Sequence, residues 1–411
     1  MTPDILGLCR KQAFSVWRAP SLPSIPDLLY PVGLISGASI VGVLSWSGCV
    51  LALPLAMTFP TLWAFSRSRV TAVLVSTGYY LAASRGLPQA VASFYSSDLW
   101  PGLLLWIVAS LAFVNVHAAL WTDRPGTGRA LRYGAAAVLM AIPPFGIAGW
   151  AHPITAAGVL FPGWGWVGFG VGAAGLIVMT TRWWPAAASA LAGLWLWSAA
   201  TWTGSGLPEG WRGIDLDQGK NLGRDTSLEQ QRDLIATVKR AAGEGARVVV
   251  LPESSLGFWT PTVAQLWQGG LLGSNVTVIA GAATVDPDGY DNVLVSISAA
   301  RARILYRERM PVPGSMWQPW RAWMGQAGGA RAHLFENSVV DLSETRVAPL
   351  ICYEQLLIWP VLHSMLYSPN MIVATGNGWW TSGTSIVAIQ KASAVAWARL
   401  FNLPLVTAFN I

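Results

Sequence analysis

The 411 residues are 53% hydrophobic but only 11% charged, whereas about 25% of the residues of an ordinary soluble protein are charged. This composition argues against a purely soluble enzyme and favours a membrane protein. The net charge of +6 lies entirely in residues 1–203, which hold ten Lys and Arg but only four Asp and Glu. These basic residues stand singly between apolar runs rather than in clusters, so we expect no direct binding of nucleic acid.

Residues 1–28 are expected to form a cytoplasmic tail, and residues 29–203 a transmembrane bundle of about seven helices. A helix needs about 20 predominantly apolar residues to cross the hydrocarbon core of a bilayer. Apolar runs of this kind recur throughout the region, and the first two are short enough to form one re-entrant pair. The runs cover roughly 29–46, 47–66, 70–86, 100–121, 131–150, 156–181 and 184–203.

Basic residues predict the orientation of these runs, because cytoplasmic loops carry the excess of Lys and Arg. With the N-terminus in the cytoplasm, the segments on that side hold nine Lys and Arg, whereas the outer loops hold only Arg85. An odd number of spans then places everything after residue 203 outside the cytoplasm. We therefore expect a multi-pass protein of the bacterial inner membrane with its C-terminal domain on the periplasmic side.

From about residue 211 the pattern changes to short β-branched runs that alternate with helical segments, which is typical of an α/β domain. Helices are expected from about Leu228 to Val238, near 356–367 and near 384–402. A β-hairpin is expected over 292–309, with its turn near Ala299 and Ala300. Further strands are expected in 211–219, 246–254, 275–285, 347–354, 370–375 and 403–410.

Two residues that follow buried strands are candidates for chemistry. Glu253 lies in "LPES", and Cys352 lies in "PLICYEQL" with Glu354 two residues further on. Because side chains alternate along a strand, Glu354 is expected on the same side as Cys352. A thiol becomes a nucleophile when a base takes its proton, and a carboxylate can be that base. The simpler alternative is that Cys352 is a buried apolar residue, as free cysteines often are.

The cysteine pattern gives no sign of a metal site or a disulfide. Cys9, Cys49 and Cys352 are the three cysteines, and none lies in a CxxC spacing or near a pair of histidines. We therefore expect neither a bound metal nor another cofactor.

The segments "LPES" and "ICYE", with the spacing between them, resemble the nitrilase or carbon–nitrogen hydrolase superfamily. Because a bundle of about seven spans precedes these segments, the chain is similar to apolipoprotein N-acyltransferase. The whole pattern resembles the related TraB-type conjugal transfer proteins of rhizobial and agrobacterial plasmids. The resemblance implies an αββα sandwich over 211–411 with a Glu, Lys and Cys triad. Glu253 then matches the general base, Cys352 the nucleophile that carries the acyl thioester, and Glu354 a further acidic residue of the acyltransferases.

The family's lysine is replaced in this chain. The acyltransferase pattern is Tyr-x-Lys-x-x-Leu-Val-Pro-Phe-Gly-Glu, whereas residues 306–316 are "YRERMPVPGSM". In this register Glu308 stands where the lysine stabilises the oxyanion, and Met316 replaces a second functional glutamate. A carboxylate would repel that oxyanion. A shift of one residue in strand register exchanges the two faces of the strand, so Arg307 or Arg309 could face the site instead of Glu308. Alternatively, all three side chains could lie at an edge of the sheet that is exposed to solvent.

Two further segments are compared with the family. Residues 375–381, "TGNGWWT", occupy the place of its Asn-Asp-x-Trp-Phe-Gly loop, with Trp379 and the aromatic character of Trp380 retained. The chain ends at Ile411, where relatives continue into closing strands and a last span. We therefore expect either a shortened domain or a fold that closes differently.

Two functions remain open from the sequence. The first is Cys-dependent acyl transfer or amide hydrolysis, with a membrane phospholipid as acyl donor, an amine or water as acceptor, and a role in conjugal plasmid transfer. The second, motivated by Glu308 and Met316, is a catalytically inactive membrane scaffold that binds proteins of the conjugation machinery. A channel is disfavoured, because no predicted span carries a charged residue near its centre.

Overall fold

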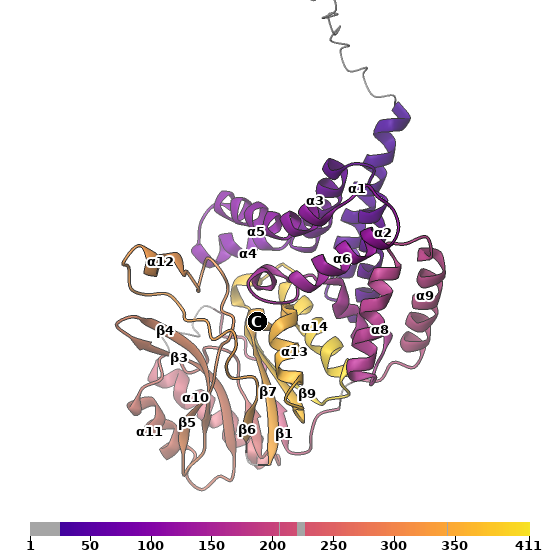
Figure 1. The fold of residues 1–411 in the computed structure, drawn as a ribbon. Coiled ribbons are helices and arrows are strands. Elements are labelled where there is room, and N and C mark those ends of the chain that lie inside the picture. The colour runs from indigo at the N-terminus through magenta and orange to yellow at the C-terminus, as the bar shows by residue number, and fades with distance from the viewer. Residues whose placement is uncertain (1–24, 205, 220–226, 343) are drawn as a thin grey trace, which may run out of the picture.

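A computed structural model describes residues 25–204, 206–219, 227–342 and 344–411 (Figure 1). Of the predicted tail 1–28, only the last four residues belong to the described chain, and they lie in a helix. The described chain has a helical part, which ends at Ala200, followed by a domain of strands and helices that begins at Trp211.

Nine α-helices and three short 3₁₀ helices make up the described helical part. The α-helices are α1 Ile25–Ser45, α2 Phe59–Ala64, α3 Arg69–Ala83, α4 Leu87–Tyr95, α5 Leu99–Leu120, α6 Thr127–Leu139, α7 Ala157–Leu160, α8 Gly165–Val178 and α9 Trp184–Ala200. The 3₁₀ helices are η2 Val50–Thr58, η3 Phe145–Ala148 and η4 Pro153–Ala156.

Two helices of the described chain, α1 over Leu28–Ser45 and α5, are long and apolar enough to cross a membrane by length and composition. The expected bundle of seven spans is therefore not confirmed. Local backbone features shorten the other runs. The run 47–66 contains Pro54 and divides into η2 and α2. The run 156–181 is interrupted where Gly163 and Gly165 adopt φ of 79° and 52°, between α7 and α8.

The second part contains two mixed sheets. The first sheet has the order β1-β2-β3-β4-β5, in which β1, β2 and β3 are parallel and β3, β4 and β5 are antiparallel. The second has the order β6-β7-β8-β9, with β7, β8 and β9 parallel. The strands are β1 Trp211–Gly213, β2 Val248–Val250, β3 Thr277–Asp286, β4 Gly289–Ile297, β5 Ala302–Arg307, β6 Val340–Leu342, β7 Thr345–Ile351, β8 Met371–Asn377 and β9 Leu405–Asn410.

These sheets form the middle layers of an αββα sandwich, as expected for 211–411. Helices α10 Leu228–Gly243 and α11 Pro261–Gly270 pack on the outer face of the first sheet through residues such as Leu234 and Trp267. The two inner faces share a core that includes Leu294 and Val373. Helices α13 Ile358–Met365 and α14 Ile386–Leu400 cover the outer face of the second sheet, and a short helix, α12 Trp320–Trp323, lies in the connection before β6 (Figure 1).

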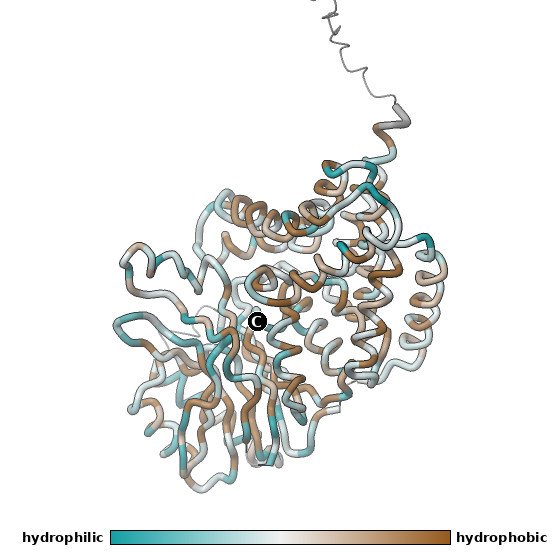
Figure 2. Tube along the Cα trace, in the orientation of Figure 1, coloured by the Kyte–Doolittle hydropathy of each residue, from teal (hydrophilic) through white to brown (hydrophobic). Residues whose placement is uncertain are grey.

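The helical part packs against α13 and α14, on the side away from the first sheet (Figure 1). A Cβ on Gly158 of α7 would lie 1.8 Å from the Ala396 carbonyl oxygen of α14, so the two helices approach at their backbones. Tyr353 Oη also donates to the Ile147 carbonyl at 2.9 Å. Figure 2 shows hydrophobic residues along the helices of the first part, while hydrophilic residues lie mostly in the loops of the sandwich.

Candidate active site

Glu253 and Cys352 lie in turns that directly follow strands, as predicted. Glu253 follows β2 and precedes Ser254, whose φ is 62°, and Cys352 follows β7 with a φ of 47°. Both side chains are buried, with 5% and 7% of their surface exposed. A left-handed backbone costs a residue other than glycine about 1–2 kcal/mol, and such strain persists where surrounding contacts hold it. The sharp turn thus sets Cys352 at the end of its strand.

The Cys352 thiol lies beside the Glu253 carboxyl group, and the contact between them affects the pKa of both groups. A second partner is Gln390 of α14, whose Nε2 lies 3.6 Å from Sγ. Burial raises the pKa of the thiol well above its usual value, and the charges of Glu253 and Glu308 raise it further. The thiol is therefore neutral in the resting site and needs a base to become a thiolate.

Glu253 is held in place by two hydrogen-bond donors. Asn292 Nδ2 donates to its Oε1 at 2.8 Å, and the backbone amide of Asn377 donates to Oε2 at 3.1 Å. Burial raises the pKa of Glu253 to about 7, although the hydrogen bonds from Asn292, Cys352 and Asn377 act in the opposite direction. A carboxyl group with such a pKa accepts and returns a proton at neutral pH.

Glu308, rather than either neighbouring arginine, lies with these groups. Its Oε2 accepts from the same Asn292 Nδ2 at 2.9 Å, and the side chain is 1% exposed. Arg307 is partly exposed and pairs with Asp291. Arg309 is buried, with Nε 2.9 Å from Tyr306 Oη and a terminal nitrogen 3.2 Å from a backbone carbonyl. Because both side chains are buried, the alternative in which Glu308 and Arg309 lie at a solvent-exposed edge of the sheet is wrong.

The position of Glu354 corrects the prediction that it shares a strand face with Cys352. Strand β7 stops at Ile351, so alternation no longer applies, and the 3₁₀ helix η6 Cys352–Leu356 turns Glu354 back. Its Oε1 accepts from Tyr306 Oη at 2.6 Å and from the Arg309 backbone amide at 2.8 Å. Its Oε2 accepts from the Ile351 amide at 2.7 Å. Glu354 therefore holds the Cys352 turn against the first sheet.

The remaining predicted positions lie around this centre. Met316 is partly exposed in the long connection before β6, where its carbonyl accepts from the Ala330 amide at 2.8 Å. Trp379 stacks on Phe94 of α4 with ring centroids 5.8 Å apart. Trp380 Nε1 donates to the Asn377 carbonyl at 2.9 Å. The loop that contains Trp379 and Trp380 thus contacts α4 of the helical part and also Asn377, whose amide donates to Glu253.

Sequence reasoning missed Asn292 and Gln390, which touch the base and the thiol. Asn292 is opposite Glu308 across the β4–β5 hairpin, and its carbonyl accepts from the Glu308 amide at 2.8 Å. A polar residue at a buried position of the expected hairpin was the signal that could have found it. For Gln390 the signal was weaker, because most glutamines on a helix lie on its solvated face and contact no reactive group.

Neither described lysine replaces the missing one. Lys239 lies on the exposed side of α10, and Lys391 pairs with Asp215 at 2.8 Å. Within the described chain no group of three or more His, Cys, Asp or Glu side chains could hold a metal ion.

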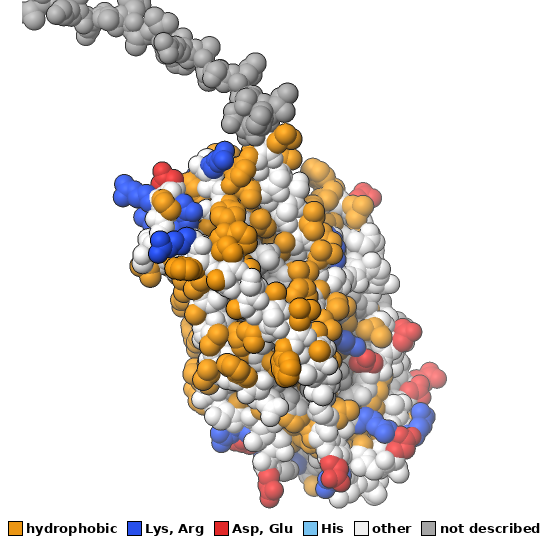
Figure 3. Space-filling model, turned by 90° about the vertical axis from the view of Figure 1, so that its right-hand side faces the viewer, with side chains coloured by type: hydrophobic (Ala, Val, Ile, Leu, Met, Phe, Trp, Pro, Cys, Tyr) orange, Lys and Arg blue, Asp and Glu red, His pale blue; other side chains and the backbone are white. Residues whose placement is uncertain are grey.

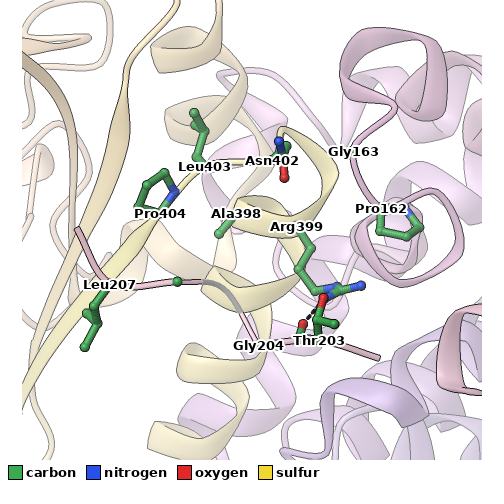
Figure 4. Close-up of a pocket in the computed structure, with 11 residues that line it drawn as sticks. Pro162, Gly163, Thr203, Gly204, Leu207, Ala398, Arg399, Asn402, Leu403 and Pro404 are labelled. Carbon is green, nitrogen blue, oxygen red and sulfur yellow. Dashed lines mark hydrogen bonds between the residues drawn. The ribbon is translucent and has the colours of Figure 1, made fainter. Parts of the chain in front are cut away.

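A pocket of about 450 Å³ lies elsewhere, between the connection after α9 and the C-terminal end of α14 (Figure 4). Arg399 projects towards Thr203 there and donates to its backbone carbonyl. None of the four predicted site residues lines this pocket, so we do not assign the chemistry to it.

Comparison with known proteins shows the family of the chain. A family model described as carbon-nitrogen hydrolase matches residues 81–399, a range that contains Glu253, Glu308, Cys352 and Glu354. The chain therefore belongs to the carbon–nitrogen hydrolase family.

Two relatives define its branch of that family. The conjugal transfer protein TraB of Agrobacterium fabrum is 62% identical, with 100% of each chain covered. The probable conjugal transfer protein TraB of Sinorhizobium fredii is also 62% identical, with 93% of this chain and 99% of the relative covered. The resemblance to TraB-type proteins is thereby confirmed. Among solved structures, a mutant of an amidase from Nesterenkonia, of the nitrilase superfamily, gives a TM-score of 0.35 at 14% identity and covers 50% of this chain and 78% of that one.

Proposed function

We propose that this protein is a membrane-bound, cysteine-dependent acyltransferase that serves conjugal plasmid transfer. The observation that carries the catalytic part is that the buried Cys352 thiol lies beside the buried Glu253 carboxyl group, which Asn292 and the Asn377 amide hold in place. The conjugation role is taken from the names of relatives that match the whole length of the chain.

In the proposed reaction, Glu253 takes the thiol proton as Cys352 Sγ attacks an acyl carbonyl carbon. The tetrahedral intermediate then expels its alcohol, which receives the proton from Glu253, and an acyl thioester remains on Cys352. An amine or water attacks this thioester with Glu253 again as base, and the thiol is regenerated. An amine acceptor gives acyl transfer, whereas a water acceptor gives hydrolysis.

A phospholipid is the acyl donor that we favour, because the helical part offers apolar surface to a bilayer. Figure 3 shows hydrophobic side chains spread over that part, with charged side chains gathered near its upper end and over the sandwich. Exposed apolar residues include Trp100 and Leu104 on α5, Val167 on α8 and Leu196 on α9. We propose several membrane spans, in the inner membrane, with the sandwich on the periplasmic side.

An inactive scaffold is the second candidate, and the site itself supplies a reason to consider it. The thiol has two buried acidic neighbours, Glu253 and Glu308, whose charges raise its pKa. Among the described residues, no arginine or lysine side chain hydrogen-bonds the thiol. A scaffold would bind partner proteins of the conjugation machinery and would not need a reactive cysteine.

Plasmid transfer by cysteine variants separates the two candidates. The acyltransferase predicts that Cys352→Ala lowers transfer to the frequency of donors that lack the protein. Cys49→Ala is the matched control, because Cys49 is a free, exposed cysteine of the helical part. Unchanged transfer by a Cys352→Ala protein present at the parent's level would instead favour the scaffold.

A further inference from the structure

The Glu308 carboxyl is a buried polar group that the proposed reaction does not yet use. It is 1% exposed and accepts from the same Asn292 side chain as Glu253, so it lies beside the proposed base. Asn292 Nδ2 occupies Oε2, but Oε1 has no hydrogen-bond partner among the described residues. A buried polar atom without a partner is costly, typically by about 1–3 kcal/mol, which suggests that Oε1 acquires a partner when the site is in use.

The surroundings of Glu308 favour its protonated form. Burial raises the pKa of Glu308 well above its usual value, and the charges of Glu253 and Glu354 act in the same direction. Glu253 and Glu308 share the Asn292 side chain, so their titrations are coupled. When Glu253 is ionised, its charge opposes ionisation of Glu308. With Oε2 occupied by the Asn292 donor, the proton belongs on Oε1.

We infer that Glu308 is a catalytic residue that, as a neutral acid, donates a hydrogen bond from Oε1 to the oxyanion formed on Cys352. The inference rests on the proposed acyl transfer. A carboxylate at this position would repel the oxyanion, whereas a carboxylic acid is a good donor to it. Arg309 cannot serve instead, because its guanidinium is committed to Tyr306, Glu354 and a backbone carbonyl.

The step is balanced without a new reagent. The thiol proton moves to Glu253 while the S–C bond forms, and the carbonyl π electrons become the oxyanion lone pair. Glu308 keeps its own proton and shares it in a hydrogen bond. When the intermediate collapses, the carbonyl re-forms and the leaving alcohol receives the proton from Glu253. Glu308 thus replaces the function of a lysine without a positive charge.

Two reagents for Cys352 test this inference. A p-nitrophenyl ester of a short fatty acid acylates the thiol through an oxyanion, whereas iodoacetamide alkylates it by direct displacement without one. Both adducts are measured on the Cys352 peptide by mass spectrometry in the full-length detergent-solubilised protein. A variant that changes only the reactivity or accessibility of the thiol changes both rates alike. The ratio of the acylation rate to the alkylation rate therefore reports stabilisation of the oxyanion.

Glu308→Met removes the donor while keeping a similar side-chain length. We expect its ratio to fall by about 100-fold, as for loss of one oxyanion donor. Glu308→Gln keeps a neutral N–H donor and should stay within about tenfold of the parent. A Glu308→Met protein with the parent's ratio would overturn the inference.

The pH course of the ratio tests the inference even if Glu308→Met does not fold. In the parent the ratio should fall at high pH, where Glu308 loses its proton, whereas in Glu308→Gln it should stay level. The same pH course in both proteins would overturn the inference. A parent whose Cys352 is alkylated but never acylated by the ester would instead contradict the proposed function itself.

Discussion

At the scale of single residues, three buried glutamates near one turn differ in their partners. Glu354 accepts from Tyr306 and from the backbone amides of Arg309 and Ile351, and its Oε1 lies 3.6 Å from the Arg309 guanidinium Nε. Glu253 accepts from Asn292 and from the Asn377 amide, and burial raises its pKa to about 7. Burial and the neighbouring charges raise the pKa of Glu308 well above its usual value. The surroundings rather than the residue type therefore distinguish these three carboxyl groups, and the proposed roles as base and acid rest on that difference.

Loss of the Arg309 side chain should destabilise the protein strongly. Arg309 and Glu354 are both fully buried, so Arg309→Met leaves a buried carboxylate without its cation. We expect a loss of about 3–5 kcal/mol in the free energy of unfolding, measured by denaturation in mild detergent. Arg307→Met is the control: its salt bridge to Asp291 is partly exposed and should contribute about 1 kcal/mol or less. Equal effects of the two variants would contradict the assigned role of Arg309.

The raised pKa of Glu253 should make stability depend on pH. Its pKa is about 7 in the folded protein and 4.5 as the reference value. Between these values the folded state holds the extra proton, so the contribution of Glu253 to stability is fully present below pH 4.5 and is lost as pH rises through about 7. The loss is on the order of 3 kcal/mol, and Glu253→Gln should reduce it. Denaturation midpoints across this pH range measure the slope, and an identical slope in Glu253→Gln would refute the assignment.

At the scale of elements, a neighbouring strand and a neighbouring helix position the turns that carry Glu253 and Cys352. Gly281 of β3 lies directly beside the Glu253 turn: a Cβ there would be 2.4 Å from the Ser254 amide nitrogen and 2.5 Å from Glu253 Cα. A side chain at 281 must therefore displace the turn. On the other sheet, α14 brings Gln390 to the thiol.

Gly281→Ala should disturb catalysis through this contact. We expect the alanine to shift Glu253 away from Cys352, to slow iodoacetamide labelling of Cys352 and to lower the melting temperature. Gly269→Ala is the matched control, because its Cβ meets open space on α11 and alanine is favoured in helices by roughly 0.5–1 kcal/mol. Labelling of Gly281→Ala at the parent's rate would show that the turn tolerates the extra carbon.

Eight of the nine described strands of the sandwich were predicted from the sequence, and β6 was not. For the strand end at 307–309, the sequence indicated Glu308 only by resemblance and left Arg307 and Arg309 as alternatives. Short β-branched runs between helical segments indicated β3, β7, β8 and β9, because strands buried on both faces are apolar throughout. A β-bulge between Leu294 and Val295 shifts the β4–β5 register, so that Leu294 pairs with Tyr306 rather than Leu305. Such a register shift cannot be recognised from the spacing of apolar residues in the sequence. It nevertheless decides whether Arg307 or Glu308 faces inward. Glu354 was misplaced for a related reason, since the end of β7 is set by the tertiary turn.

At the scale of the whole molecule, the helical part and the sandwich share a continuous core. Ala394 and Trp397 of α14 are buried in the same cluster as Phe59 and Tyr79 of the helical part. Apolar composition predicted a helical first part. It could not give helix lengths, because Pro54, Gly163 and Gly165 break the runs where packing requires turns.

The sandwich alone should not form a stable soluble domain. Residues 208–411 without the helical part would expose the buried faces of α13 and α14, including Trp397 and Val361. Large exposed apolar patches favour aggregation. Size-exclusion chromatography of this fragment should therefore give aggregate, whereas a folded monomer would contradict the shared core.

The most direct test of the central claim is detection of an acyl thioester on Cys352. Purified full-length protein incubated with phospholipid should gain one fatty acyl mass on the Cys352 peptide, and hydroxylamine should remove it. The adduct should persist in Cys49→Ala, be reduced in Glu253→Gln and be absent in Cys352→Ala. If Cys352 remains unacylated in folded protein whose thiol still reacts with iodoacetamide, the assignment of Cys352 and Glu253 as nucleophile and base is contradicted.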